Sequence, residues 1–313
     1  MAANDDTTMN WEDLKRSIDE SRARRREEEA RQATEGGALA PSPSHQQPRR
    51  EPVQLPLWPE PVRAVPNSIL RSALFGVRGA SKGSERKHLE SVEIASVDGV
   101  TVRYSGAQLD QNDLDVWETV LHAVRQQAMG DKCHVTAYSL LKLMGMSING
   151  KNRDTLKRRI TRLVGATVEI QTERYWYAGT LIRDAVQDER TKEWVIELNP
   201  NLRPLFAPNQ FTQMQWAIRQ ELGKNQLAKW LHGFYSSHAK PYPMRPEKLL
   251  HLAGSTNKSG RTQEIRKALA AIATASAKHG EEFAFEVRDG LVHITKTPSR
   301  SQRRHLRRRK RAG

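Results

Sequence analysis

The feature that most constrains this chain is one order of predicted elements that occurs twice: a helix, a shorter helix, a turn, a helix with a basic face, and paired strands. The first copy spans residues 114–198 and the second spans residues 220–295. This is the order of a winged helix-turn-helix domain, in which the second helix of the pair enters the DNA major groove. We therefore predict an α+β fold with two tandem winged helix-turn-helix domains, over residues 70–199 and 200–297.

A predicted β-hairpin precedes the first copy. Alternating apolar residues over 91–97 and 100–104 flank Asp98-Gly99, a dipeptide that favours a tight hairpin turn. Asp113 is the expected N-cap of a helix over 114–127, whose apolar residues recur at helical spacing. After it we expect helices over 136–144 and 152–164 with a break at Gly145, strands over 167–171, 176–182 and 193–198, and a turn over 187–191.

The second copy repeats these elements. A helix over 220–237 is stopped by the prolines of residues 241–246, which cannot continue it. We then expect a short helix over 246–252, a helix over 260–277 capped by Ser259, and strands over 283–287 and 291–295 joined through Asp289-Gly290.

The candidate DNA contacts lie on the second helix of each pair, opposite its apolar stripe. A basic face alone is typical of a solvated helix, but its place after a helix-turn-helix turn favours DNA. Arg and Lys bind guanine edges or phosphates, Gln reads adenine, and Thr contacts a thymine methyl group. Arg153 and Arg261 lie nearer the apolar edge, where phosphate contact or structural packing is expected. The predicted DNA-binding residues are Arg153, Lys157, Arg158, Thr161, Arg162, Arg261, Gln263, Arg266 and Lys267.

The charge balance points to the same kind of partner. Lys and Arg number 51 against 36 Asp and Glu, a net charge of +15. Such an excess attracts polyanions, so nucleic acid is the expected partner. Eight of the basic residues lie in 299–313, which holds no acid. We predict that residues 298–313 are a disordered basic tail that adds phosphate contacts, although such tails also bind RNA.

A short apolar island, Gln54-Leu55-Pro56-Leu57-Trp58, follows a polar region that we predict to be disordered over residues 1–53. Isolated apolar clusters in such segments are often docking peptides. The alternative is that Leu57 and Trp58 pack on the adjoining domain.

Other protein classes find little support in the sequence. The single cysteine, Cys133, excludes an internal disulfide and fits a reducing compartment, and no apolar run approaches the length of a membrane span. We expect a cytoplasmic protein that is not an enzyme and needs no cofactor or metal. Residues 145–151 match three positions of a phosphate loop, but Asn152 stands where that loop requires Ser or Thr.

The sequence resembles the TrfA family of plasmid replication initiators, which belongs among the iteron-binding initiators. The resemblance covers residues 54–295 and leaves both tails out. It is carried by Arg63-Ala-Val-Pro-Asn67, Arg71-Ser-Ala-Leu-Phe75, Trp117, Met146-Ser-Ile-Asn-Gly150, Tyr235-Ser-Ser-His238 and Pro241-Tyr-Pro243.

This resemblance implies a protein that binds direct repeats in double-stranded origin DNA and promotes duplex opening. It implies recruitment of the host initiator ATPase, replicative helicase and sliding clamp. It also implies a monomer-dimer equilibrium that limits copy number, with dimers joined largely through the first winged helix. Residues 54–58 resemble the clamp-binding pentapeptide of the family, so Gln54, Leu55, Leu57 and Trp58 are the expected clamp contacts. Pro56 and Trp58 depart from that pattern, and weaker clamp binding is expected.

Two other functions are compatible with parts of this pattern. A transcriptional repressor would use the same helices, but it has no need of a clamp peptide and would be expected to bind inverted rather than direct repeats. A relaxase or primase would need an arranged nucleophile or a metal cluster, and the sequence offers neither.

Overall fold

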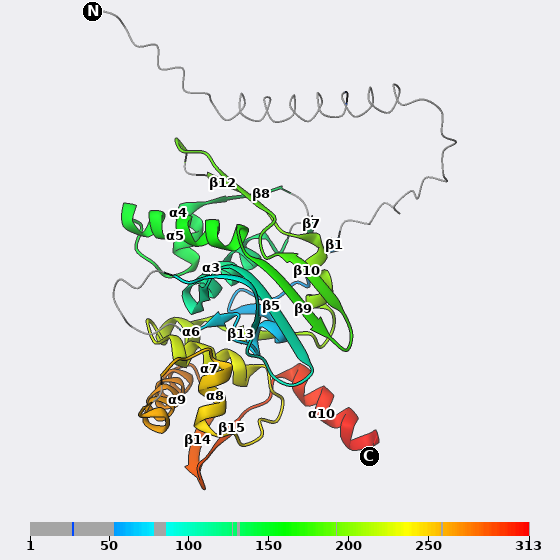
Figure 1. The fold of residues 1–313 in the computed structure, drawn as a ribbon, viewed down its shortest axis with the longest axis vertical. Helices are drawn as coiled ribbons and strands as arrows, with labels where there is room; N and C mark the ends of the chain where they lie inside the picture. Colours follow the sequence, from blue (N-terminus) through cyan, green and yellow to red (C-terminus); the bar gives the residue numbers. More distant parts are fainter. Residues whose placement is uncertain are drawn as a thin grey trace, which may run out of the picture. The chain divides into compact units, whose positions relative to one another are not determined.

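The computed structural model describes Glu27 and residues 53–77, 86–126, 128–129, 132–191, 193–257 and 259–312. The chain divides into two compact units, residues 1–51 and residues 52–313, and the second is the one described below (Figure 1). The predicted disorder over residues 1–53 lies outside the described residues except at Glu27 and Val53.

Within this unit, residues up to β13 form a first half and the remaining residues a second. The first half contains β1 (Val53–Gln54), β2 (Val62–Pro66), α2 (Asn67–Leu70), β3 (Phe75–Gly76), β4 (His88–Ile94), β5 (Val100–Ala107), β6 (Leu109–Asp110), α3 (Gln111–Val124), β7 (Ala128–Met129), β8 (Lys132–Thr136), α4 (Ala137–Leu143), α5 (Gly150–Val164), β9 (Thr167–Thr172), β10 (Trp176–Thr180), β11 (Asp184–Gln187), β12 (Glu193–Glu197), the 3-10 helix η1 (Pro200–Phe206) and β13 (Phe211–Gln215). The second half contains α6 (Trp216–Glu221), α7 (Gln226–Ser236), α8 (Pro246–Leu252), α9 (Arg261–Lys278), β14 (Phe283–Arg288), β15 (Leu291–Lys296) and α10 (Arg300–Ala312).

Helix α3 is the centre of the first half and is buried along most of its length. Asp110 caps it by accepting hydrogen bonds from two N–H groups of the first turn, and the Asp113 side chain accepts from the N–H of Asp110. This reciprocal capping box starts the helix three residues before the predicted start at residue 114. Trp117 is fully buried and donates its indole N–H to the carbonyl of Leu181 at 3.2 Å.

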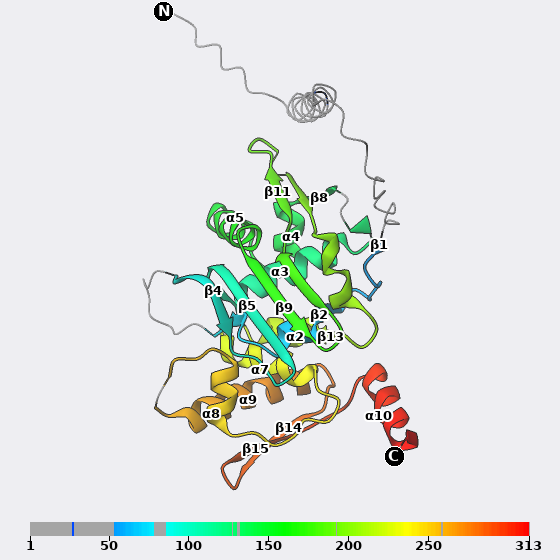
Figure 2. The ribbon, with the colours of Figure 1, turned by 45° about the vertical axis from the view of Figure 1, so that its right-hand side comes forward.

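Two antiparallel sheets flank α3 and its neighbours (Figure 2). One has the strand order β10-β9-β5-β4 and the other the order β11-β12-β8. The hairpin predicted at Asp98-Gly99 is present as β4–β5, and Gly99 takes a left-handed φ of 81°. The strands predicted over 167–171 and 176–182 form β9–β10, which pairs with β5. The hairpin that pairs with β8, before the helix pair, is β11–β12.

The second half departs from the prediction at its first helix. A single helix was expected over 220–237, but Gly223, with a φ of 54°, separates α6 from α7. Asn225 then caps α7 by accepting the N–H of Ala228 at 3.0 Å. The hairpin predicted at Asp289-Gly290 is present as β14–β15, with positive φ at both residues, as a type I′ turn requires.

Two hydrophobic clusters place the boundary between the halves later than residue 199. The first cluster extends from Leu55 to Met214 and the second from Ile218 to Val292. Residues 200–215 belong to the first because β13 pairs with β2. The same pairing buries all of β2, so the folded part begins well before residue 70.

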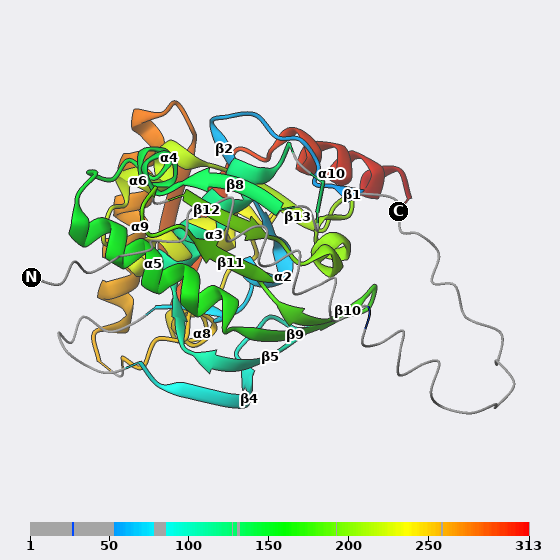
Figure 3. The same cartoon turned by 90° about the horizontal axis from the view of Figure 1, so that it is seen from above.

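The prediction of a disordered basic tail over 298–313 is wrong for the residues that the structure describes. Residues Arg300–Ala312 form helix α10. Ser299 and Gln302 start it with a capping box: the Ser299 hydroxyl accepts the N–H of Gln302 at 3.3 Å, and the Gln302 side chain accepts the N–H of Ser299 at 3.0 Å. Figure 3 shows this helix from above, lying apart from α5 and α9.

None of the helices in the described part of the chain has both the length and the apolar character needed to cross a membrane.

Candidate nucleic-acid interface

The two predicted DNA-contacting helices, α5 and α9, hold the same topological position. In the first half, β8 precedes α4 and α5, and it pairs with β12, the second strand of the following hairpin. In the second half, Met244 precedes α8 and α9, and it pairs with Val292 in β15, again the second strand of the hairpin. The repeat inferred from the sequence is therefore present as a repeated order of two helices and a hairpin, preceded by strand β8 in the first half and by the single β-bridge residue Met244 in the second.

Helix α5 exposes four residues of the predicted set: Arg153, Lys157, Arg158 and Thr161. The Lys157 ammonium forms an ion pair with Glu189, in the turn between β11 and β12. Both side chains of that pair are about half exposed or more, at 49% and 63%, so the pair holds Lys157 only weakly. The basic side chains on this surface are therefore available to a phosphate or a base edge.

Arg162 does not belong to this exposed surface. Its Nη2 lies 2.6 Å from Oδ1 of Asp113, a carboxylate that is fully buried. Arg86 reaches the other oxygen of the same carboxylate at 2.8 Å. The predicted DNA contact at Arg162 is therefore replaced by a structural role: the residue lies on the polar side of α5 by angle, but its guanidinium reaches back to Asp113 and anchors α5 to the first turn of α3.

Helix α9 exposes Gln263, Arg266 and Lys267, and no carboxylate in the described part of the chain lies within ion-pair distance of either cation. Arg261 is half-buried, and its Nε donates to the carbonyl of Asn257 at 3.4 Å. Arg261 therefore lies against the turn that leads into α9, where structural packing was one of its two expected roles.

Sequence reasoning missed two exposed cations close to the α5 surface. Lys151 lies in the first turn of α5, because the helix starts at Gly150 under an Asn149 cap rather than at residue 152. Arg190 is exposed in the turn between β11 and β12. The N-cap preference of Asn was a local feature that could have moved the predicted start and included Lys151.

A buried ionic cluster joins the two halves. Arg219 of α6 is 1% exposed, and its Nε lies 2.7 Å from Asp115 and 2.6 Å from Glu118, both on α3. Lys229 of α7 reaches the second oxygen of Asp115 at 2.6 Å. Burial raises the pKa of Glu118 to about 7, although the neighbouring Arg219 guanidinium lowers it. The cluster ties both α6 and α7 to the helix that also anchors α5.

The predicted docking peptide is largely packed against the first half. Leu55 and Trp58 are each 3% exposed, whereas Leu57 is 66% exposed. Gln54 lies in β1, opposite Ala128 of β7. The Trp58 ring stacks on Phe206 with a centroid distance of 6.4 Å. Two of the expected clamp contacts, Leu55 and Trp58, are thus inaccessible in this conformation, because their side chains fill the core of the adjoining domain.

Hydrogen bonds and ion pairs around Trp58 reinforce this packing. Nε1 of Trp58 donates to Nδ1 of His122 at 3.0 Å, so the proton of the neutral His122 ring is on Nε2, which lies 2.8 Å from a Glu60 carboxylate oxygen. Arg125 bonds the other Glu60 oxygen and the Trp58 carbonyl. These hydrogen bonds lower the pKa of Glu60 to about 2. The segment around Trp58 is therefore held by charge as well as by apolar contact.

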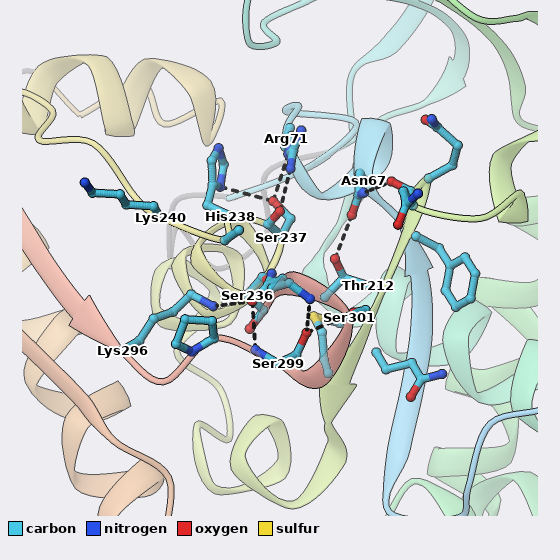
Figure 4. A pocket seen from close by; sticks show the side chains of 18 of the residues that line it. Asn67, Arg71, Thr212, Ser236, Ser237, His238, Lys240, Lys296, Ser299 and Ser301 are labelled. Carbon is cyan, nitrogen blue, oxygen red and sulfur yellow. Dashed lines mark hydrogen bonds between the residues drawn. The ribbon is translucent and has the colours of Figure 1, made fainter. Parts of the chain in front are cut away.

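A cleft with a volume of about 1320 Å³ lies where the C-terminal end of α7, β13, β15 and the start of α10 meet (Figure 4). Its polar lining groups bond one another: Arg71 to Ser237 at 3.0 Å, and Thr212 to Asn67 at 2.7 Å. Across the described residues, no group of three or more His, Cys, Asp or Glu side chains could hold a metal ion.

Comparison with known proteins agrees with the resemblance stated above. The sequence model of the family described as TrfA protein matches residues 44–296. The plasmid replication initiator protein TrfA of Escherichia coli is 28% identical over 243 residues, which are 75% of this chain and 62% of that protein. The chain thus spans less than two thirds of the length of this curated relative.

Two solved structures align with this chain at low sequence identity. Domains 2 and 3 of RctB align with a TM-score of 0.50 at 12% identity, covering 74% of this chain and 98% of that one. The Pi initiator protein in complex with iteron DNA aligns more weakly, with a TM-score of 0.45 at 12% identity over 59% of this chain and 91% of that one. Because the family model covers most of the sequence, the chain belongs to the TrfA protein family.

Proposed function

We propose that this chain is a plasmid DNA replication initiator that binds directly repeated duplex sites at an origin, promotes duplex opening and recruits host replication proteins. The observation that carries the proposal is the pair of exposed basic helices, α5 and α9, in equivalent positions of a TrfA family fold. The curated relative is itself named a plasmid replication initiator. The proposed site of action is the cytoplasm.

In this proposal each repeated unit is a winged helix. The two helices and the hairpin of each half support it, together with the residue before each helix pair that bridges to the hairpin and the exposure of the second helix. Helices α5 and α9 enter successive major grooves, and the hairpins β11–β12 and β14–β15 are the wings. The buried cluster around Arg219 ties the second half to α3, so α5 and α9 keep a constant spacing. Repeated DNA sites of constant length require such a spacing.

The proposed base and phosphate contacts are the exposed residues of the two helices. Arg and Lys supply phosphate contacts and guanine recognition, and Gln263 is suited to adenine. Arg162 is left out because its guanidinium is committed to Asp113. The set is Lys151, Arg153, Lys157, Arg158 and Thr161 on α5, with Gln263, Arg266 and Lys267 on α9.

Clamp binding by residues 54–58 remains part of the proposal, with a condition that the packing imposes. A partner pocket can take Leu55 and Trp58 only after the segment leaves the core and the Trp58–His122 bond breaks. The exposed Leu57 offers an initial contact. Recruitment of the initiator ATPase and helicase, and a monomer-dimer equilibrium, follow from family membership alone.

The test is footprinting of the purified chain on the replicon DNA that encodes it, at about 0.15 M salt, where non-specific phosphate binding is already weakened. Protection of several direct repeats is the expected result. A single inverted repeat over a promoter would instead make the chain a repressor. The absence of any discrete footprint would overturn sequence-specific binding altogether.

Matched variants separate the proposed contacts from general charge. One test variant combines Lys157→Ala with Arg158→Ala on α5, and the other combines Arg266→Ala with Lys267→Ala on α9, so that each removes two exposed cations. The control pair is Arg103→Ala with Arg203→Ala, which removes the same charge from exposed positions outside α5 and α9. The footprint should weaken in both test variants and persist in the control.

A further inference from the structure

Helix α10 is docked on the second half through one face. The Gln302 side chain donates to the carbonyl of Ser236, at the end of α7, at 2.7 Å, and it accepts from the Lys296 ammonium at 3.1 Å. Leu306, one helical turn later, is half-buried and lines the cleft beside it. Gln302 and Leu306 are four residues apart and therefore share one face of the helix. Figure 4 shows the start of α10 seated beside Ser236 and Lys296.

Another face of α10 is a row of arginines. At about 100° per residue, the four arginines whose side chains are described fall within an arc of roughly 100°, centred about 130° around the helix from the docked face. All four side chains are exposed, and no carboxylate within the described ranges forms an ion pair with them. The α10 basic face consists of Arg300, Arg303, Arg304 and Arg307.

This face lies away from the proposed DNA-reading helices. In the views of Figures 1, 2 and 3, α10 lies to the right of both α5 and α9. A duplex that lies along α5 and α9 is therefore on another side of the molecule. The α10 basic face has to meet a different stretch of polyanion.

We propose that the α10 basic face is a second, sequence-independent binding surface for the phosphate backbone of duplex DNA, occupied by a segment other than the one that α5 and α9 contact. This inference rests on the proposed function in one respect: it takes α5 and α9 as the helices that contact the first DNA segment. The second segment is either a flanking part of the same molecule or a separate one.

The chemistry of the face favours duplex phosphates over other polyanions. Arginine forks bind phosphate oxygens in pairs, and four of them in a row follow a backbone. Residues 299–313 contain no Phe, Tyr or Trp, whereas single-stranded DNA is usually held by stacking on such rings. The only apolar side chain larger than alanine there, Leu306, points into the cleft, so no apolar face is left to enter a membrane.

The experiment uses the full chain, immobilised and saturated with a duplex that carries its footprinted sites. A labelled duplex of unrelated sequence is then added over a series of salt concentrations. The test variant changes all four residues of the α10 basic face to Gln, which keeps helix propensity. The control variant changes Arg103, Arg183, Arg203 and Lys224 to Gln and removes the same charge from other exposed positions.

The expected result is that the test variant keeps its footprint but captures at least tenfold less of the second duplex at about 0.15 M salt, with a salt slope lower by about 3.6 for four phosphate contacts. The control should capture the second duplex normally. On one long duplex, loss of flanking protection would assign the second segment in cis, and lost capture of a separate duplex would assign it in trans.

Three results would overturn the proposal. These are equal capture by test variant and unaltered chain, equal loss in test and control variants, or loss of the specific footprint together with the second duplex. Retention of vesicles with anionic lipids, without any duplex capture, would reassign the face to membranes. A missing footprint for the unaltered chain would refute the proposed function and leave this measurement in place, because the unrelated duplex needs no site.

Discussion

Replacement of Arg219 by Met should destabilise the chain more than replacement of any exposed arginine. Arg219 is 1% exposed and faces two buried carboxylates, at 2.7 Å for Asp115 and 2.6 Å for Glu118. Methionine keeps much of the volume and removes the charge. Removing one member of a buried ionic group costs about 3–5 kcal/mol, because the remaining charges stay buried without compensation. That is a large share of a typical unfolding free energy of about 5–15 kcal/mol.

Urea unfolding measures this loss through the transition midpoint at unchanged slope. Arg183→Met is the matched control. Arg183 also pairs with a carboxylate, Glu197 at 2.8 Å, but its side chain is 58% exposed. The control should lose less than about 1 kcal/mol. If Arg219→Met lost no more than Arg183→Met, the buried cluster would not be what holds the two halves together.

The pH dependence of the Arg219→Met deficit tests the same reasoning independently. Burial raises the pKa of Glu118 from 4.5 to about 7, and Arg219 opposes this shift, so the variant should raise the pKa further. A raised pKa in the folded state means that the folded chain binds the proton more tightly than the unfolded chain. Stability then falls as pH rises from about 4.5 toward the folded pKa. The loss of unfolding free energy in Arg219→Met should therefore be smaller at pH 5 than at pH 8. An equal loss at both pH values would contradict the conclusion that Arg219 stabilises the ionised Glu118 carboxylate.

Three further outcomes are expected. Arg162→Ala should cost about 1.5–3 kcal/mol in urea unfolding, because it removes one charged hydrogen bond to the buried Asp113 carboxylate while Arg86 keeps the other oxygen. Lys157→Ala should leave stability within about 1 kcal/mol and lower the salt slope of DNA binding by about 1. A free peptide of residues 54–58 should bind the host clamp about 10²–10⁴ times more tightly than the full chain. In the full chain the segment must first leave the core, and exposing Leu55 and Trp58 costs roughly 1.5–3 kcal/mol each. Equal affinities in fluorescence anisotropy would show that the packing of this segment does not oppose clamp binding. Burial lowers the pKa of His232 from 6.5 to about 3. Below about pH 6.5 only the unfolded chain takes up that proton, so the free energy of unfolding decreases as the pH is lowered, by up to about 1.4 kcal/mol per pH unit. His232→Gln should therefore remove one proton from the slope of stability against pH measured between about pH 6.5 and 4.

Local sequence features were sufficient where the structure is decided locally. The hairpin at Asp289-Gly290 could be predicted because both residues tolerate the positive φ that the turn requires. The basic helix α9 could be predicted from the spacing of its apolar residues. The start of α10 was equally local, since Ser299 and Gln302 form a capping box, but the density of positive charge outweighed this feature in the prediction.

Long-range partners were beyond the reach of periodicity. Arg162 lies on the polar side of its helix by angle, and only the fold brings it to Asp113, 49 residues earlier. Trp58 meets His122 across 64 residues, so the apolar island alone left packing on the adjoining domain as one of two alternatives; that alternative holds for Trp58 and not for Leu57. The pairing of β2 with β13 joins segments almost 150 residues apart and moved the domain boundary with it.

The acidic residues of α3 separate two groups of cations in this chain of net charge +15: cations paired with buried carboxylates, which hold the fold together, and exposed cations that are free to contact DNA. Asp113 takes the inward arginine of α5, while Asp115 takes Arg219 and Lys229 from the second half. The cations that pair with these carboxylates are structural, whereas the proposed DNA contacts on α5, α9 and α10 are exposed. Since the anchors of α5 and of the second half lie two residues apart on one helix, the orientation of both proposed DNA-reading helices depends on the position of α3. A substitution that moves α3 should therefore disturb the two helices together rather than one at a time.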